Sequence, residues 1–442
     1  MRSNSLTIDY LPIDAVRPYG NAVRIHNRTK YRKLRKSIER FGQLVPIIVD
    51  PEHVIVDGHA VHAVMRELGA EQIAVVVASG RSEPEIRALR LALNRIPQDA
   101  KWNDEHLRLE FSALMELSFD LELTGFEVAE IDSILEIDAP QANILEDPDD
   151  IPAPSKNPAT EPGDIWICGP HRVACGDALD QSAAESLLEG QRPTMAFCDP
   201  PYLKVDGFVS GLGQVRHREF LQGSGEMSPE QFQAFLSGTL EALRNTVSDG
   251  AVIYVCIDWR HLFDLALAAR NSRLAMINLC VWAKTNAGMG SLYRSQHELI
   301  AVFQAGAALH SNNVDLGRYG RHRSNLWTYR GLNSFGVGRD DLLAAQPTIK
   351  PVAMIADAIR DVTRRKDAVL DLFLGFGSTL IAAEETGRRC FGMELDPGYV
   401  DVAVRRWQQH TGRDAVHAGT GAIFADVLAL RQEQGGGERH GS

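Results

Sequence analysis

Four consecutive residues, Asp199-Pro200-Pro201-Tyr202, have groups that suit the binding of an exocyclic base amine. They directly follow an apolar run, residues 194–198, whose composition predicts a buried strand. Because two prolines cannot continue a strand ladder, the chain must turn there in a stiff, extended conformation. Such a turn directs the Asp199 carboxylate and the Pro200 carbonyl outward as two acceptors, which match the two N–H donors of the amine. Tyr202 adds a flat face on which a base that has left its duplex can stack.

The same four residues also suit an ordinary turn after a strand, and by themselves they favour neither interpretation. A second element lies further along the chain, where an apolar strand, residues 369–373, runs into a turn with Gly375 and Gly377 and then into a helix. The glycines allow a ligand to approach the backbone, and the helix N-terminus offers N–H donors. Glu394 ends the next predicted strand, in a position suited to binding a ribose diol.

A dinucleotide-binding dehydrogenase would also have an acid at this spacing. Its fingerprint requires a third glycine, however, and position 380 is Leu. A dehydrogenase also gives no role to the segment from Asp199 to Tyr202. The two elements together therefore favour a different reaction on a nucleotide-containing cofactor.

The part of the chain after Gly163 alternates short apolar runs with amphipathic helices, which predicts an α/β fold. Continuous apolar strands indicate a sheet that is covered on both faces. One helix start is clear, because Ser228 can cap, Pro229 suits the first position and Gln231 completes a capping box. We expect a doubly wound, Rossmann-like domain with strands at 194–198, 251–257, 276–282, 298–303 and 368–373.

Three motifs in this domain resemble those of DNA amino-methyltransferases. Asp371-x-Phe373-x-Gly375-x-Gly377-x-Thr379 is similar to their cofactor motif, and Asp199-Pro200-Pro201-Tyr202 looks like their catalytic motif. Gln346-Pro347-Thr348-x-Lys350-Pro351 is similar to the element that precedes the cofactor motif and helps hold the methionine end, although the family usually has His where this chain has Gln346. The catalytic motif comes first, which is the permuted order of the β group. The resemblance covers residues 163–409.

This resemblance implies a methyltransferase that uses S-adenosylmethionine and no metal. Its substrate would be double-stranded DNA and its target adenine N6, because families that methylate cytosine N4 more often have Ser where Asp199 stands. Cytosine N4 methylation stays an alternative, as does a non-catalytic DNA-binding protein of regulation or segregation. The implied catalytic residues are Asp199, Pro200, Pro201 and Tyr202. The implied cofactor-binding residues are Asp177, Lys350, Asp371, Phe373, Gly375, Gly377, Ser378, Thr379 and Glu394.

Residues 317–339 carry arginines and aromatic side chains without one acid, inside the segment 305–345 where the permuted order places target recognition. Arginine can hold phosphates or bind guanine edges. We therefore expect DNA contacts from Arg318, Arg321, Arg323 and Arg330, with a solvated basic loop as the alternative. A further segment, residues 291–298, is similar to the one that packs around the flipped base, although His297 and Glu298 equally suit a structural pair.

Residues 1–98 resemble the ParB N-terminal domain, with Val56-Asp57-Gly58-His59 among the matching residues. Nucleotide-hydrolysing relatives carry an arginine where this chain has Val61, so hydrolysis is not expected. Residues 30–40 form a basic helix that suits either DNA contact or solvation. We expect a helical connector at 99–140, an acidic, proline-rich linker at 141–162, the methyltransferase domain at 163–431 and a disordered tail at 432–442. This arrangement is similar to DNA modification methylases of prophages and bacteria.

The composition is that of a globular protein of 442 residues, with 44% hydrophobic and 24% charged residues and a net charge of -12. No apolar run reaches membrane-spanning length and the first residues lack a signal core, so a cytoplasmic protein is expected. None of the six cysteines forms a CxxC pair, which indicates reduced thiols rather than a zinc site. The sequence leaves open whether the protein forms a homodimer or works with a restriction endonuclease.

Overall fold

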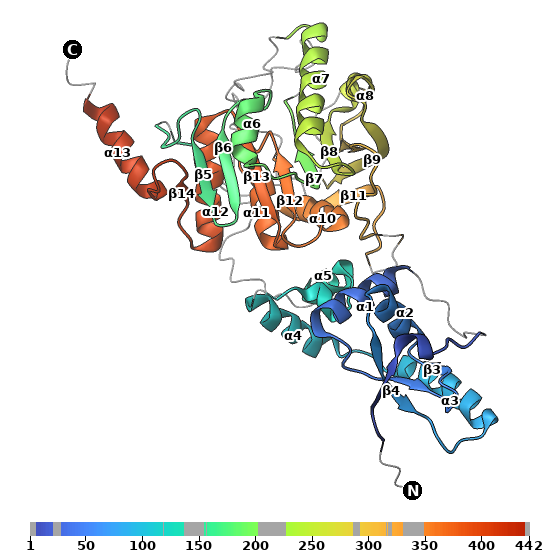
Figure 1. Ribbon diagram of the computed structural model, residues 1–442. Helices are drawn as coiled ribbons and strands as arrows, with labels where there is room; N and C mark the ends of the chain where they lie inside the picture. The colour runs from blue at the N-terminus through green and yellow to red at the C-terminus, as the bar shows by residue number, and fades with distance from the viewer. Residues whose placement is uncertain are drawn as a thin grey trace. The chain divides into compact units, whose positions relative to one another are not determined.

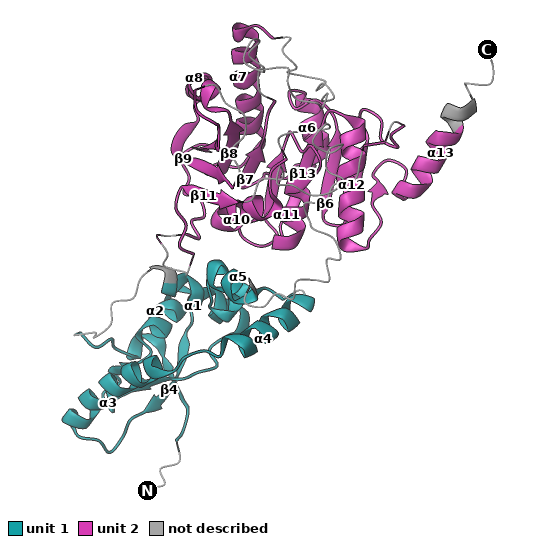
Figure 2. Cartoon of the chain, turned by 180° about the vertical axis from the view of Figure 1, so that it is seen from behind, with its two compact units in different colours: residues 1–139 teal, residues 140–442 magenta. Residues whose placement is uncertain are grey.

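The computed structural model describes residues 6–20, 28–117, 119–136, 154–155, 157–201, 227–285, 292–314, 316, 321–329 and 349–437. The chain forms two compact units, residues 1–139 and 140–442, which are coloured separately in Figure 2. The boundary lies at the end of the predicted helical connector. Among the described residues, no helix is both long enough and apolar enough to cross a membrane.

The first unit contains a small mixed sheet with the strand order β1-β4-β2-β3. β4 pairs antiparallel with β1 and parallel with β2, and β2 pairs antiparallel with β3. Val49, Ile55, Ile73 and Val75 of its strands belong to one buried apolar core. The strands are β1 (Asp9–Pro12), β2 (Ile47–Val49), β3 (Ile55–Asp57) and β4 (Gln72–Val77), and the helices are α1 (Arg28–Phe41), α2 (His59–Glu67) and α3 (Glu83–Arg95).

The predicted connector forms two helices, α4 (Asp104–Glu116) and α5 (Val128–Glu136), around a 3-10 turn at Leu121–Thr124. Phe111, Leu121 and Ile131 give this segment a small core of its own. The segment predicted as a helical connector thus contains two helices and buries apolar side chains of its own.

The second unit is built on a ten-stranded sheet with the order β11-β9-β10-β8-β7-β12-β13-β6-β5-β14 (Figure 1). Its five central strands, from β8 to β6, all run parallel. The strands are β5 (Ile165–Cys168), β6 (His171–Cys175), β7 (Met195–Cys198), β8 (Val252–Ile257), β9 (Ala275–Lys284), β10 (His297–Gln304), β11 (Leu326–Tyr329), β12 (Ala368–Asp371), β13 (Arg389–Glu394) and β14 (Val416–His417).

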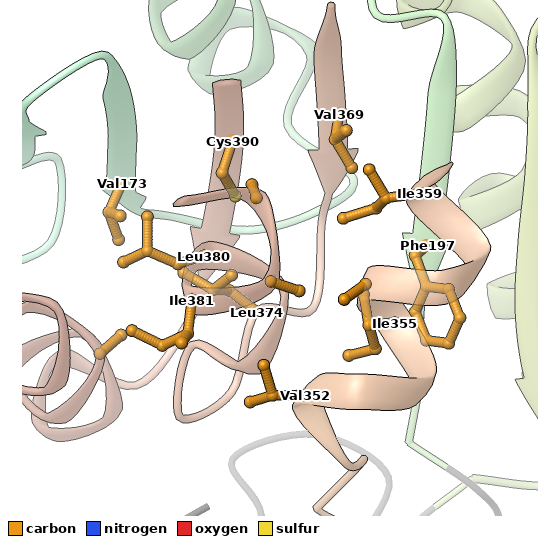
Figure 3. Packing of buried hydrophobic residues seen from close by; sticks show 14 of the residues in the cluster. Val173, Phe197, Val352, Ile355, Ile359, Val369, Leu374, Leu380, Ile381 and Cys390 are labelled. Atoms are coloured by element: carbon orange, nitrogen blue, oxygen red, sulfur yellow. The ribbon is translucent and has the colours of Figure 1, made fainter. Parts of the chain in front are cut away.

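Helices cover both faces of this sheet, so two apolar cores form. One core joins the sheet to α10 (Val352–Val362), α11 (Ser378–Thr386) and α12 (Pro397–Thr411), and the other joins it to α6 (Gln181–Leu188), α7 (Pro229–Thr246) and α8 (Leu262–Asn271). Figure 3 shows Ile355 and Ile359 of α10 beside Phe197 and Val369 of the sheet. The predicted doubly wound fold is confirmed, and so is the capping box at Ser228.

The predicted linker and tail differ from the structure at their ends. Ala159 and Thr160, inside the predicted linker 141–162, are buried. Their backbone N–H groups donate hydrogen bonds of 2.7 and 3.0 Å to the carboxylate of Asp401 on α12, which hold this segment against the domain. Residues 432–437, placed in a disordered tail, complete α13 (Phe424–Gly437). The Arg431 guanidinium anchors this helix with an ion pair of 2.5 Å to Asp164. A composition rich in proline or glycine does not reveal such polar anchors.

Candidate active site

The end of β7 holds Asp199 at the carboxyl edge of the sheet. Pro200 is buried and Pro201 is partly buried, which fixes the turn, whereas Tyr202 lies outside the described residues. Asp199 does not stand alone, because its Oδ2 accepts a hydrogen bond of 2.5 Å from Lys350 Nζ. The Lys350 side chain is 4% exposed and the Asp199 side chain 17% exposed, so the ammonium is buried and the carboxylate partly buried.

Lys350 also contacts a second acid. Its Nζ lies 3.1 Å from Oε2 of Glu298 on β10, and Oε1 of Glu298 accepts a 2.5 Å hydrogen bond from Lys284 on β9. The sequence predicts Lys350 as a residue of the cofactor's methionine end, whereas the structure pairs it with Asp199. Gln346, Pro347 and Thr348 of the same motif lie outside the described residues.

The predicted cofactor motif forms a closed turn between β12 and α11. The Asp371 carboxylate accepts a hydrogen bond of 2.6 Å from the Thr379 hydroxyl and one of 3.0 Å from the Phe373 N–H. Gly377 has a φ of +84°, and a Cβ there would stand 2.8 Å from the Cβ of Ala403 on α12. Asp371 and Thr379 therefore build the turn, and glycine is required at 377 because a helix packs against it.

Ser378 and Phe373 complete this part of the site. Ser378 is buried at the first position of α11. The Phe373 ring lies edge-on to Phe235 of α7, with 6.1 Å between the ring centres. The cofactor turn is thus supported from both layers of helices.

Glu394, at the end of the neighbouring strand β13, is tied to the same turn. Its Oε2 accepts a hydrogen bond of 2.8 Å from the Gly375 N–H and its Oε1 one of 2.9 Å from the Asp396 N–H. The Gly176 N–H donates to the Glu394 carbonyl at 2.9 Å, which brings the next residue, Asp177, to this edge after β6. Three parallel strands thus place Asp177, Glu394 and Asp371 in one row beside Asp199.

Burial changes the titration of two of these acids. It raises the pKa of Asp371 to about 7, with the charges of Asp199 and Glu394 acting in the same direction against the hydrogen bonds from Thr379 and Phe373. Burial also raises the pKa of Glu394 to about 7, and the Asp396 charge adds to the effect. A cation bound beside these carboxylates would favour their ionised forms.

Comparison with known proteins agrees with this geometry. Residues 194–405 match the family described as DNA methylase, and residues 105–162 match the ParB-methyltransferase HTH domain. The larger unit carries a DNA methylase domain. This family of DNA amino-methyltransferases uses S-adenosylmethionine, and the residues present fit that cofactor: a glycine turn, a helix N-terminus and acids that suit its sulfonium and ammonium groups.

Two relatives are type II methyltransferases. M2.DpnII of Streptococcus pneumoniae is 24% identical over 230 residues, which make up 50% of this chain and 84% of the relative. M2.LlaDCHI of Lactococcus lactis subsp. cremoris is 24% identical over 256 residues, 55% of this chain and 94% of the relative. The crystal structure of the M1.HpyAVI–SAM complex covers 53% of this chain and 97% of its own, with 17% identity and a TM-score of 0.39.

Two arginines predicted to contact DNA have acidic partners inside the methylase domain. Arg321 and Arg323 both pair with Asp357 and Asp361 of α10, at distances from 2.9 to 3.3 Å. The Arg321 side chain is only 8% exposed. Both guanidinium groups help to hold the β11 segment against α10, so phosphate binding would have to break these ion pairs. Arg318 and Arg330 lie outside the described residues.

The basic face of α1 is also paired. Lys33 forms an ion pair of 2.9 Å with Glu127, Lys36 pairs with Glu122, and Arg32 lies 3.6 Å from Glu127. Both acids belong to the segment that matches the HTH domain, Glu122 in the 3-10 turn and Glu127 directly before α5. The face of α1 for which the sequence left DNA contact open therefore faces an acidic segment of its own unit.

The structure brings into the site two residues whose role the sequence did not reveal. Glu298, predicted either to pack around the flipped base or to form a structural pair with His297, contacts both Lys350 and Lys284. Cross-strand pairing explains the contact between Glu298 and Lys284. Glu298 lies opposite Trp282 in the β9–β10 ladder, and Lys284 is two residues further along the same face. Only the strand register reveals that neighbour.

Val61, which stands where nucleotide-hydrolysing ParB relatives carry an arginine, packs against the core of the first unit.

Proposed function

We propose that this protein transfers a methyl group from S-adenosylmethionine to N6 of adenine in double-stranded DNA. The observation that carries the proposal is the position of Asp199, at the end of the strand next to the one that leads into the cofactor turn. The two motifs meet at neighbouring strand ends although about 170 residues of sequence separate them. Aspartate at position 199 favours adenine over cytosine.

The chemistry needs an amine nitrogen that is oriented and made more nucleophilic. The Asp199 carboxylate and the Pro200 carbonyl would accept the two N–H groups of the flipped base, which directs the nitrogen lone pair out of conjugation with the ring. S-adenosylmethionine supplies the methyl group as a sulfonium substituent. The nitrogen would attack the methyl carbon while the carbon–sulfur bond breaks, so that S-adenosylhomocysteine would leave as a neutral thioether and the methylated nitrogen would lose one proton to solvent. Orientation of the amine by Asp199 would provide much of the acceleration.

Within the cofactor site, Glu394 would accept hydrogen bonds from the ribose hydroxyls, and Asp177 would lie near the adenine ring. Asp371 and Thr379 would act indirectly, because their side chains bond to each other and hold the turn. Gly375, Gly377, Ser378 and Phe373 would shape the turn and the start of α11. Arg318 and Arg330 lie outside the described residues and stay proposed DNA contacts, whereas Arg321 and Arg323 pair with Asp357 and Asp361.

The test identifies the product. The full chain is incubated with isotope-labelled S-adenosylmethionine and mixed-sequence duplex DNA, and the digested nucleosides are analysed by mass spectrometry, with single-stranded DNA and RNA in parallel. N6-methyladenine from duplex DNA is the expected product. N4-methylcytosine would contradict the adenine assignment while keeping the reaction class. Cofactor binding without transfer to any nucleic acid would contradict the proposed activity and favour a binding protein.

A further inference from the structure

Four alternating charges form a row that begins at the proposed catalytic carboxylate. They are Asp199 after β7, Lys350 before α10, Glu298 on β10 and Lys284 on β9, joined by contacts of 2.5, 3.1 and 2.5 Å. The two inner members, Lys350 and Glu298, have side chains that are 4% and 12% exposed. Four separate segments of the chain therefore meet in one row that has no net charge, with Lys350 buried and its neighbours partly buried.

The inner charges depend on each other. Burial alone would lower the pKa of Lys350, but the charges of Asp199 and Glu298 raise it above its ordinary value. Burial alone would raise the pKa of Glu298, but Lys350 and Lys284 hold it below its ordinary value. Removing one inner charge would leave another buried without its partner, which is costly. Each inner charge is therefore stabilised by its neighbours in the row, unlike the charges of separate surface ion pairs.

We propose that Lys350 is a positioning residue for Asp199 and not a ligand of the cofactor, with Glu298 and Lys284 holding Lys350 in place. This inference rests on the proposed function of Asp199. An ammonium within hydrogen-bond distance favours an ionised carboxylate and fixes the direction of its oxygens. An amine that must present its lone pair to a methyl group needs that fixed acceptor.

This interpretation differs measurably from the role expected for the motif around Lys350. A residue that binds the methionine end contributes to cofactor affinity, so its loss raises the Kd for S-adenosylmethionine. A residue that acts through Asp199 contributes to the transfer step, so its loss lowers kcat at saturating cofactor. The two effects are read in separate assays of the same variant.

The main variant is the double substitution Lys350→Met with Glu298→Gln, which removes one positive and one negative buried charge and keeps the row neutral. We expect kcat to fall about a hundredfold, the cost of misplacing a reacting group, while the Kd for S-adenosylmethionine changes less than about threefold. Lys350→Arg keeps the charge and should recover part of the lost kcat. Circular dichroism and thermal melting establish that each variant is folded.

A matched control is Arg431→Gln, which breaks the ion pair between α13 and Asp164 in the same unit, away from the row. It should lower thermal stability without changing kcat. This comparison separates a general loss of stability from a loss of positioning.

A double-mutant cycle tests whether Lys350 acts through Asp199. In an Asp199→Asn background, Lys350→Met should cause little further loss of single-turnover rate, because the acceptor it positions is already altered. Losses that multiply fully would contradict the inference. So would a Lys350 variant with a normal kcat and a Kd for S-adenosylmethionine raised about tenfold or more. A wild-type protein that methylates no nucleic acid would instead overturn the proposed function, so the two failures are distinguishable.

Discussion

Lowering the pH from 8 to 6 should weaken the binding of S-adenosylmethionine, because Glu394 titrates in this range. Burial raises the pKa of Glu394 from 4.5 to about 7. The proposed ribose contact uses the ionised carboxylate as the acceptor of hydroxyl hydrogen bonds. Protonation of Glu394 below pH 7 removes the ionised form that accepts these hydrogen bonds, so the affinity for S-adenosylmethionine falls as the pH falls.

The magnitude follows from a single titration. A group with a pKa of about 7 is roughly nine-tenths ionised at pH 8 and roughly one-tenth ionised at pH 6, so the apparent Kd should rise about tenfold. Burial likewise raises the pKa of Asp371 to about 7. If binding the cationic cofactor also requires that carboxylate to ionise, the rise approaches a hundredfold.

Isothermal titration calorimetry at pH 6, 7 and 8 measures the effect, using two buffers of different ionisation enthalpy. Binding near pH 6 should release about one proton for each group that must ionise, and the heat should depend on the buffer. Glu394→Gln should bind weakly and show a smaller pH dependence than the wild type. A wild-type Kd that is constant within about twofold from pH 8 to pH 6 would refute the reasoning.

Three further substitutions test the structure elsewhere. Gly377→Ala combines a positive φ with a Cβ 2.8 Å from that of Ala403. The free energy of unfolding should fall by about 2–4 kcal/mol and cofactor binding should weaken; an unchanged midpoint of unfolding would contradict the turn geometry. Asp361→Asn leaves two arginines short of a buried partner and should cost about 3 kcal/mol in the same assay, whereas a neutral effect would show that the pairs are dispensable. Glu127→Gln removes the 2.9 Å partner of Lys33, which keeps a longer contact of 3.9 Å to Glu130. The substitution should cost less than about 1 kcal/mol but raise low-salt DNA affinity in fluorescence anisotropy; unchanged affinity would mean that the basic face of α1 does not meet DNA.

The positions of the candidate site residues at one edge of the sheet can be predicted from the sequence because their signals are local. Asp199 and Glu394 end apolar runs and Asp371 lies within one, and the ends of parallel strands lie at the same edge of a sheet. Glycines and prolines at fixed positions mark the turns without any knowledge of distant contacts. The doubly wound fold follows from the same runs, since strands that are apolar on both sides require helices on both faces.

Long-range polar contacts are what the sequence does not reveal. Lys350 and Asp199 are 151 positions apart, and the motif that contains Lys350 gives no sign that its ammonium turns to Asp199. Arg321 and Arg323 are similar cases: an arginine-rich segment indicates DNA, but the structure supplies acids on α10 that engage both guanidinium groups. In each case the partner depends on packing between helices and strands.

The central claim is that Asp199 at the end of β7 carries out methyl transfer with a cofactor held at β12 and β13. The most direct measurement compares the wild type with Asp199→Ala for both methyl transfer to duplex DNA and binding of S-adenosylmethionine. We predict that the variant loses at least about a hundredfold in transfer rate and still binds the cofactor. A variant that methylates DNA at the wild-type rate would contradict the account.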